Sequence, residues 1–368
     1  MESAPGGGWM KSRVASLALI PALLGGAGQA SAASDAAFHP KASVLELTNV
    51  TFHDGRTLPR LKLYTQTLGQ PHRDANGEID NAVLLLHATG GQGSDFLTPS
   101  FAQPLFATGK PLDIHKFFVI LPDAIGHGHS SKPSDGLRTR FPKYNYDDMV
   151  ALQHRVVSDA LGVHKLRLIL GTSMGCMHTF LWGVSYPDQM RALITMACSP
   201  FPVVGMNWIW RQGVIQAIQS DPAYRNGNYT SQPAQGLQAL SVLTAIAGGG
   251  APNYAATYPS QSAVDAMLTA RNQAVLKAAD ANDTVYQFSA SKGYNVWPKI
   301  HRIKAPLLWW DSADDFINPP TLPYPQMALA AMKNFRYKLQ PASTQTAGHY
   351  TFLKAEFFAS DVAAMLRE

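Results

Sequence analysis

One short segment constrains the fold of this 368-residue chain more than any other. Residues 171–175, with the sequence GTSMG, directly follow an apolar run at 166–170 and open a stretch of helical spacing at 174–184. A G-x-S-x-G pattern between a strand and a helix is typical of a sharp turn that presents a nucleophilic serine. Larger side chains would clash beside that serine, and the helix start supplies N–H groups and positive dipole for a developing oxyanion. We therefore predict that Ser173 is a catalytic nucleophile.

Apolar runs recur along the chain and alternate with segments of helical spacing. We expect strands at 43–52, 61–67, 82–86, 117–121, 166–170, 192–197, 306–310 and 335–339, and helices at 146–161, 174–184 and 354–366. This alternation indicates an α/β fold with a mostly parallel, twisted sheet flanked by helices. Residues 200–303 interrupt it, and we expect them to form an inserted helical cap over the sheet edge where ligands bind. The core is then formed by residues 33–199 and 304–368.

A serine hydroxyl is a weak nucleophile that needs a base, and the base needs an orienting carboxylate. Where the serine stands on such a turn, the chain order is serine, acid, histidine. His349 follows the last expected strand and is the predicted base. Three acids compete after the strand at 306–310: Asp311 lies too near the strand, and Asp315 is preferred over Asp314.

The oxyanion that forms during acyl transfer needs two N–H donors. One should come from Met174, directly after the nucleophile. The other should come from the loop after the strand at 82–86, from Ala88 or Thr89. In the loop at 123–131 (DAIGHGHSS), two histidines suggest a metal, but no carboxylate or cysteine cluster completes a site. We interpret that loop as structural and expect neither a metal nor a cofactor.

The first 32 residues have the pattern of a signal peptide. Lys11 and Arg13 precede an apolar run at 14–24, and the sequence ASA at 30–32 fits a cleavage site of small residues. The apolar run is too short to cross a bilayer, and no later segment is long enough without charge or proline. We therefore expect an exported protein, periplasmic or secreted, with no membrane span after removal of the signal.

Composition bears on the partners, the core and the cysteines of this chain. The net charge is +5 without a dense Lys/Arg block, so no nucleic-acid partner is expected. The hydrophobic fraction of 46% is enough for a large core. The two cysteines, Cys176 and Cys198, have no metal-ligand spacing. A disulfide between them is possible after export, although two separate buried thiols are the preferred interpretation.

With these motifs assembled, the chain resembles the homoserine O-acetyltransferase branch of the α/β-hydrolase superfamily from about residue 84 to the C-terminus. The resemblance is carried by the sequences GTSMGCM at 171–177, WGVSYPD at 182–188, DP at 221–222, GNY at 227–229, DAN at 280–282 and GHYTFL at 348–353. It implies the α/β-hydrolase fold, a triad of Ser173, Asp315 and His349, and a homodimer formed through the cap.

Two positions depart from this resemblance. In the family, an aspartate after the catalytic histidine holds the homoserine amine, but Tyr350 stands there. The family's arginine for the substrate carboxylate would fall at position 241, which is Ser241. A closed pocket must compensate both charges of an amino acid, so homoserine is not the expected acceptor. Arg211, Tyr229 and Tyr350 are the candidate residues of a different substrate pocket.

The expected activity is cleavage of a small-molecule carboxylic ester through an acyl-enzyme on Ser173, with water releasing the acyl group. The alternative is an O-acyltransferase that passes the acyl group from its donor to an alcohol. A minor alternative is a catalytically silent binding protein, because a fold does not fix function.

Overall fold

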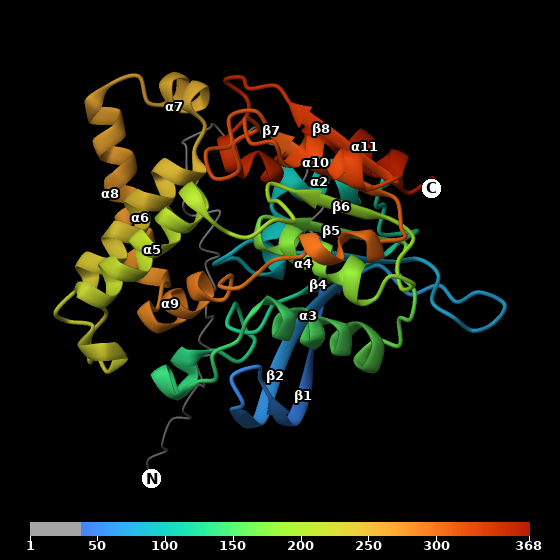
Figure 1. Cartoon of the computed structure of the whole chain (residues 1–368), viewed down its shortest axis with the longest axis horizontal. Coiled ribbons are helices and arrows are strands. Elements are labelled where there is room, and N and C mark those ends of the chain that lie inside the picture. Colours follow the sequence, from blue (N-terminus) through green and yellow to red (C-terminus); the bar gives the residue numbers. More distant parts are fainter. Residues whose placement is uncertain (1–37) are drawn as a thin grey trace, which may run out of the picture.

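The computed structural model describes residues 38–368, which contain one sheet of eight strands. In spatial order these are β1 (Lys41–Thr51), β2 (Thr57–Leu68), β4 (Phe118–Pro122), β3 (Ala82–Leu86), β5 (Leu168–Thr172), β6 (Leu193–Met196), β7 (Leu307–Ser312) and β8 (Phe335–Gln340). All pairs from β4 to β8 are parallel, whereas β1 and β2 form an antiparallel edge. The predicted mostly parallel sheet with flanking helices is confirmed (Figure 1).

Helices cover both faces of the sheet. The helices α3 (Tyr146–Arg155) and α4 (Met174–Ser185) pack on one face, and α2 (Pro99–Phe106) and α11 (Ala359–Met365) pack on the other. The helix α10 (Tyr324–Ala331) packs against β8. The predicted helix at 146–161 is α-helical only to Arg155 and then continues as a π-helical turn, Val156–Ala160.

The predicted closing helix at 354–366 is wrong in its first turn. A 3₁₀ turn at Ala355–Phe357 comes first, and Phe358 breaks the helical path with φ −134° and ψ 2°. Its side chain is 1% exposed and packs against Phe101 and Trp310. This anchoring contact sets the backbone at Phe358, and α11 starts only after it.

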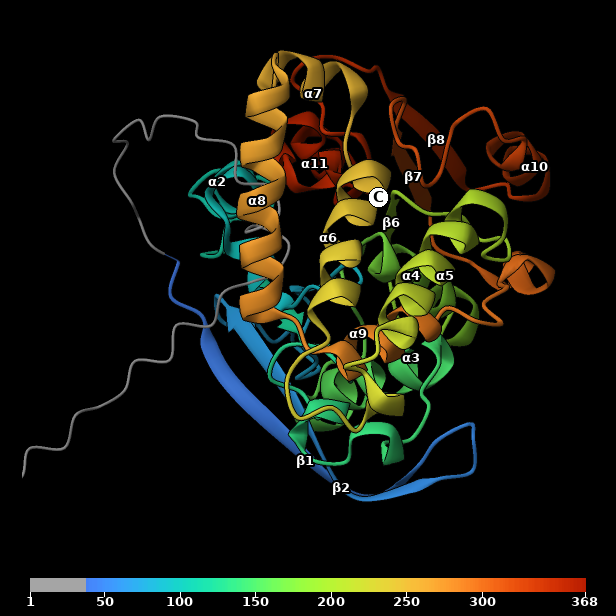
Figure 2. The ribbon, with the colours of Figure 1, turned by 90° about the vertical axis from the view of Figure 1, so that its left-hand side faces the viewer.

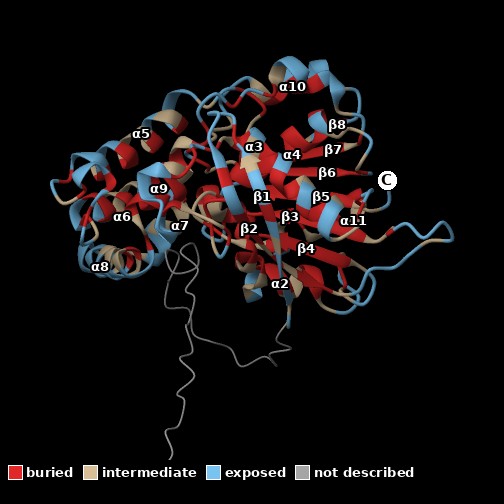
Figure 3. Cartoon of the chain, turned by 90° about the horizontal axis from the view of Figure 1, so that it is seen from below, coloured by how far each residue is buried: buried red, intermediate tan, exposed pale blue. Residues whose placement is uncertain are grey.

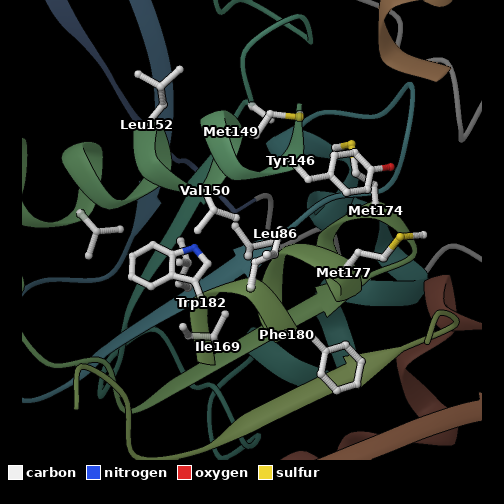
Figure 4. Packing of buried hydrophobic residues seen from close by; sticks show 14 of the residues in the cluster. Leu86, Tyr146, Met149, Val150, Leu152, Ile169, Met174, Met177, Phe180 and Trp182 are labelled. Carbon is white, nitrogen blue, oxygen red and sulfur yellow. The ribbon is translucent and has the colours of Figure 1, made fainter. Parts of the chain in front are cut away.

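Burial follows the layers of the fold. Every residue of β3, β4 and β5 is buried because helices cover both faces, whereas the edge strand β1 is largely exposed (Figure 3). On the α3 and α4 face, Leu86 and Ile169 project from the sheet toward Val150 of α3 and Trp182 of α4 (Figure 4). Full burial of one such apolar side chain stabilises the fold by roughly 1.5–3 kcal/mol. The strand β5, which leads to Ser173, is therefore held rigidly.

The chain leaves the sheet after β6, returns at β7, and forms a helical layer in between (Figures 1 and 2). The helices of this cap are α5 (Gly205–Ser220), α6 (Ala234–Gly248), α7 (Ala251–Thr257), α8 (Gln261–Ala278) and α9 (Ala281–Ser289). The helix α6 packs against α5 and α8, and the layer has its own core around Ile218, Leu237 and Val275. The boundaries given above for core and cap stay predictions.

Cys176 and Cys198 form a disulfide, with their Cα atoms 5.9 Å apart. The preference for two separate thiols is therefore wrong. No local pattern in the sequence pairs them, because the α4 turn and the segment after β6 meet only through the sheet. The bond joins the first turn of α4 to the segment that carries the chain toward the cap.

Reduction of this disulfide should lower the free energy of unfolding by about 3 kcal/mol, because the bond closes a loop and so restricts the conformations of the unfolded chain. The two cysteines are 22 residues apart. Denaturant unfolding with and without reductant measures the effect. The double variant Cys176→Ala/Cys198→Ala is the control and should not respond to reductant. Equal midpoints for the wild-type chain in both conditions would contradict the stabilising role.

The predicted signal peptide, residues 1–32, lies outside the described residues. Within residues 38–368, no helix combines the length and apolar character needed to cross a membrane.

Candidate active site

The turn between β5 and α4 holds Ser173 at φ 53° and ψ −109°, a region that residues other than glycine rarely adopt. A Cβ atom on Gly171 would lie 2.0 Å from the carbonyl oxygen of Gly175, and one on Gly175 would lie 1.9 Å from that of Leu86. No side chain fits at either position, which explains both glycines of the motif. The backbone conformation of Ser173 costs roughly 1–3 kcal/mol and persists only where the surrounding structure enforces it.

Ser173, His349 and Asp315 come together from three separate loops. The Nε2 atom of His349 lies 2.8 Å from Ser173 Oγ, and its Nδ1 atom lies 2.7 Å from Asp315 Oδ2. Ser173 directly follows β5, Asp315 follows β7, and His349 lies in a 3₁₀ turn after β8, Gly348–Leu353. The three residues are 6%, 4% and 2% exposed, in the order serine, histidine, acid. This arrangement can move a proton from the hydroxyl to the imidazole while the carboxylate orients the ring.

The carboxylate of Asp315 is fixed by its own loop. Its Oδ1 atom accepts hydrogen bonds from the N–H groups of Ile317 (2.7 Å) and Asn318 (3.0 Å), which leaves Oδ2 for the histidine. The side-chain amide of Asn318 donates to the carbonyl oxygen of Ala197 and accepts from Asn207 of α5. Asn318 therefore links the acid loop, the end of β6 and the cap.

The competing acids have other partners. Asp314 braces the loop that carries His349 by accepting hydrogen bonds from Ser312 Oγ, Thr346 Oγ1 and Gly348 N. Asp311 lies inside β7 and accepts a hydrogen bond from the N–H of Ala197 at 3.0 Å. Burial raises the pKa of Asp311 well above its ordinary value, and the negative charge of Asp315 adds to the rise. Neither carboxyl group contacts the histidine ring.

The loop after β3 is anchored beside the start of α4. His87 accepts a hydrogen bond from the N–H of Ala124 at Nε2 (3.0 Å), and its Nδ1 donates to the carbonyl oxygen of Ala88 (2.9 Å). Burial lowers the pKa of His87, which keeps the ring neutral and fixes this tautomer. The carbonyl oxygen of His87 accepts from the N–H of Gly175. His87 therefore positions the loop rather than reacting.

This anchoring brings the candidate oxyanion donors to one edge of the sheet. Ala88 and Met174 are buried, at 5% and 0% exposure. Thr89 is part-buried, and its hydroxyl group is buried without a hydrogen-bond partner. Their roles as N–H donors stay predictions.

The loop after β4, residues 123–131, is held in place by hydrogen bonds to Asp123. Asp123 accepts from the backbone N–H groups of Gly93 and His129, both at 2.8 Å. His127 is fully buried, and burial lowers its pKa to about 3. Within residues 38–368, no three His, Cys, Asp or Glu side chains are grouped as a metal site would need.

The three candidate pocket residues lie in different surroundings. Tyr350 is part-buried beside His349, with ring centroids 6.0 Å apart. Arg211 is buried on α5, where its Nε donates to Asn207 and its Nη1 has no partner. Tyr229 belongs to the core of the cap, and its hydroxyl donates to the carboxylate of Asp280 at 2.7 Å. The structure thus brings only Tyr350 next to the histidine.

Sequence analysis missed Arg271 of α8, whose side chain is 3% exposed. The one signal for it in the sequence is its spacing. Leu268 and Val275 lie three residues before it and four after it, which places Arg271 on their apolar face of the helix.

A family model described as the alpha/beta hydrolase fold matches residues 81–355, which is most of the chain. The chain belongs to this family. As an α/β-hydrolase, it is an enzyme of the hydrolase and acyltransferase kind and is similar to homoserine O-acetyltransferases.

Relatives of this α/β-hydrolase have acyltransferase names. A probable acyltransferase of Methanothermobacter thermautotrophicus is 27% identical over 283 residues, covering 76% of this chain and 85% of the relative. A homoserine O-acetyltransferase of Leptospira biflexa is 25% identical over 352 residues, covering 84% of this chain and 89% of the relative.

Solved structures show the same fold. The homoserine O-acetyltransferase from Bacillus anthracis has a TM-score of 0.77 at 21% identity, covering 89% of this chain and 98% of its own. An acetylester hydrolase from Corynebacterium glutamicum has a TM-score of 0.76 at 19% identity, covering 89% and 96%.

These relatives correct the predicted localisation. Export to the periplasm or medium is contradicted, because relatives of this chain are named homoserine O-acetyltransferases and homoserine O-succinyltransferase. The pattern of charged, apolar and small residues at 1–32 suggested a signal peptide, but that segment lies outside the described residues.

Proposed function

We propose that this α/β-hydrolase is an O-acyltransferase with a serine nucleophile. It forms an acyl-enzyme on Ser173 and passes the acyl group to an alcohol. The observation that carries the proposal is the buried, hydrogen-bonded chain from Ser173 through His349 to Asp315. Two relatives that align over most of the chain carry acyltransferase names, which supports transfer to an acceptor.

In the first half of the reaction, His349 Nε2 takes the proton of Ser173 Oγ as the oxygen attacks the acyl carbonyl carbon. The N–H of Met174 and that of Ala88 or Thr89 then donate hydrogen bonds to the tetrahedral oxyanion. The imidazolium returns its proton to the leaving group as the bond to that group breaks, and the acyl-enzyme remains.

In the second half, the acceptor alcohol loses its proton to His349 Nε2 as its oxygen attacks the acyl carbonyl carbon. The bond from that carbon to Ser173 Oγ then breaks, the imidazolium returns the proton to Ser173 Oγ, and the new ester leaves. Asp315 keeps the Nδ1–H of His349 in place in both halves and stabilises the imidazolium. Ser173 is only 6% exposed, so any acceptor must enter a nearly closed site to reach the acyl-enzyme.

Hydrolysis is the second candidate, in which water replaces the alcohol. The observation that favours it is Tyr350, a phenol at the position where the resemblance expects the carboxylate that holds the amino-acid acceptor. An esterase function also matches the name of one similar structure, the acetylester hydrolase.

Partition of the acyl-enzyme separates the two candidates. The purified protein is mixed with p-nitrophenyl acetate and increasing concentrations of short alcohols, and acetate and acetyl esters are quantified. We expect transfer to exceed hydrolysis at millimolar alcohol, although water is present at a far higher concentration. Unchanged release of acetate at every alcohol concentration would instead establish a hydrolase.

A homodimer formed through the cap also stays a prediction. Its support is a set of exposed apolar side chains on the cap and beside it, namely Met206, Ile209, Ile246, Val264 and Phe316. Four of these, all but Ile209, line an apolar groove of about 760 Å³ between α6, α8 and the acid loop.

A further inference from the structure

Arg271 is a buried cation without an anion. Its side chain is 3% exposed, and no carboxylate among residues 38–368 forms an ion pair with it. Its guanidinium makes a long hydrogen bond of 3.4 Å from Nη2 to Thr244 Oγ1, and its Nε has no partner. Its charge acts on the hydroxyls of Tyr254 and Tyr350, where it opposes the rise in pKa that burial causes. Buried charges in proteins are normally paired, because an unpaired one loses its hydration without compensation. A missing anionic ligand would explain this arrangement.

The guanidinium lies where the cap helices α6 and α8 meet the 3₁₀ turn that carries His349, Gly348–Leu353, called the histidine turn below. Arg271 projects from α8 toward Thr244 of α6. Gly248, also on α6, lies against the ring of Tyr350. A Cβ atom at Gly248 would lie 2.1 Å from Cε2 of Tyr350. Burial raises the pKa of Tyr350 to about 12, and the neighbouring charge of Arg271 opposes the rise. Arg271 is therefore close to the residue that directly follows His349.

Other donors at this place also have no partner. The hydroxyl of Ser241 is fully buried without a hydrogen bond, one turn before Thr244 on α6. The acids of the adjoining loop are engaged: Asp314 with Gly348, and Asp315 with His349. The place thus offers hydrogen-bond donors and positive charge, and no free carboxylate that could hold an ammonium group.

We propose that Arg271, with the hydroxyls of Tyr350 and Ser241, binds a carboxylate of the substrate next to the nucleophile. The inference rests on the proposed acyl transfer and specifies its substrate class: a hydroxycarboxylate or its ester without an α-amino group. The resemblance expects an aspartate for an amine after the histidine and an arginine for a carboxylate at position 241, but the chain has Tyr350 and Ser241 there. Arg271 would supply the carboxylate partner from a different helix, and nothing takes the place of the amine partner. The carboxylate belongs either to the alcohol portion or to the acyl chain, and substrates of both kinds distinguish the two.

The test compares matched esters. For the alcohol portion these are 4-acetoxybutyrate and its neutral amide; for the acyl chain they are p-nitrophenyl hydrogen succinate and p-nitrophenyl butyrate. Arg271→Met should lower kcat/KM about 10- to 100-fold for one anionic ester, the usual effect of losing hydrogen bonds to a charged group. The matched neutral ester should change less than about 3-fold, because it makes no such contact. Arg271→Lys, which keeps the charge but not the fork, should lie in between, mainly through KM.

The exposed Lys277 on the same helix provides the charge control, since Lys277→Met should alter neither ester pair. Thermal melts exclude a merely structural role: Arg271→Met should melt at or above the wild-type temperature, because it removes an unpaired buried charge. If Arg271→Met does not fold, the KM increase of Arg271→Lys on the anionic ester carries the test.

Equal losses on anionic and neutral esters would overturn the proposal, as would a wild-type enzyme with no preference for either anion. If neutral esters still turn over in those cases, the proposed acyl transfer survives. Should no ester react, thermal stabilisation of the wild type by 4-hydroxybutyrate or succinate, lost in Arg271→Met, tests the carboxylate site without turnover. Absence of stabilisation by both would then reject it.

Discussion

Replacing Ser173 with alanine should lower kcat/KM for both acyl transfer and ester cleavage by roughly 10⁴- to 10⁶-fold, the range for serine nucleophiles that act with a histidine. The effect is chemical, because alanine keeps the Cβ atom that the strained turn already accommodates at φ 53°. The substitution removes only Oγ, the atom that bonds to the acyl carbon. Stability should change by less than about 1 kcal/mol, since a single hydrogen bond to His349 disappears.

Turnover of p-nitrophenyl acetate measures this loss, and labelling with a fluorophosphonate probe followed by intact mass identifies the modified residue. Ser185→Ala, at the exposed end of the same helix, is the matched control and should leave turnover and labelling unchanged. Retained activity in Ser173→Ala would assign the nucleophile elsewhere. A wild-type protein that neither labels nor turns over would support the silent binding protein.

Replacing Asp315 with asparagine should lower kcat by roughly 10⁴-fold, because an amide there favours the wrong tautomer of the histidine. The carboxylate now accepts from His349 Nδ1 at 2.7 Å and is fixed by two backbone N–H groups. Those N–H groups hold the oxygen of asparagine on Oδ1 and turn its NH₂ group toward the ring. Nδ1 then becomes an acceptor, and Nε2 carries the proton it should receive from Ser173.

Asp314→Asn is the matched comparison, one residue away on the same loop. Among residues 38–368, Asp314 accepts from Ser312, Thr346 and Gly348 and not from His349, so its variant should lose less than about 10-fold, through a looser histidine turn. Steady-state kinetics of both variants decide between the two acids that the sequence left in competition. The reverse order of effects would make Asp314 the orienting acid.

The sequence predicts the site well where the geometry is local. Ser173 and its glycines form one contiguous turn, and the clashes that exclude side chains at Gly171 and Gly175 involve atoms of that turn and the neighbouring strand. His349 and Asp315 were predicted from chain order, because each follows a strand of a parallel sheet and all such strands end at one edge. The structure brings these three side chains into hydrogen-bond contact.

Prediction fails where contacts depend on how distant segments pack. The pocket role of Tyr229 stays a prediction, and the sequence did not reveal that its hydroxyl donates to Asp280, about fifty residues later in the chain. Arg271 was missed because its burial is created by α6 and the histidine turn, and its spacing from Leu268 and Val275 does not identify either of those partners. The disulfide was misjudged for the same reason, since the sheet alone brings Cys176 close to Cys198.

The amide of Asn318 has a consequence for anyone who redesigns this enzyme. It holds Asn207 of the cap, while its backbone N–H holds the carboxylate of Asp315. Substitutions in α5 and in the acid loop therefore share a partner, and their free energies should not add. A transplanted cap that lacks Asn207 would change substrate choice and reaction rate together, so specificity and turnover in this fold cannot be engineered as separate modules.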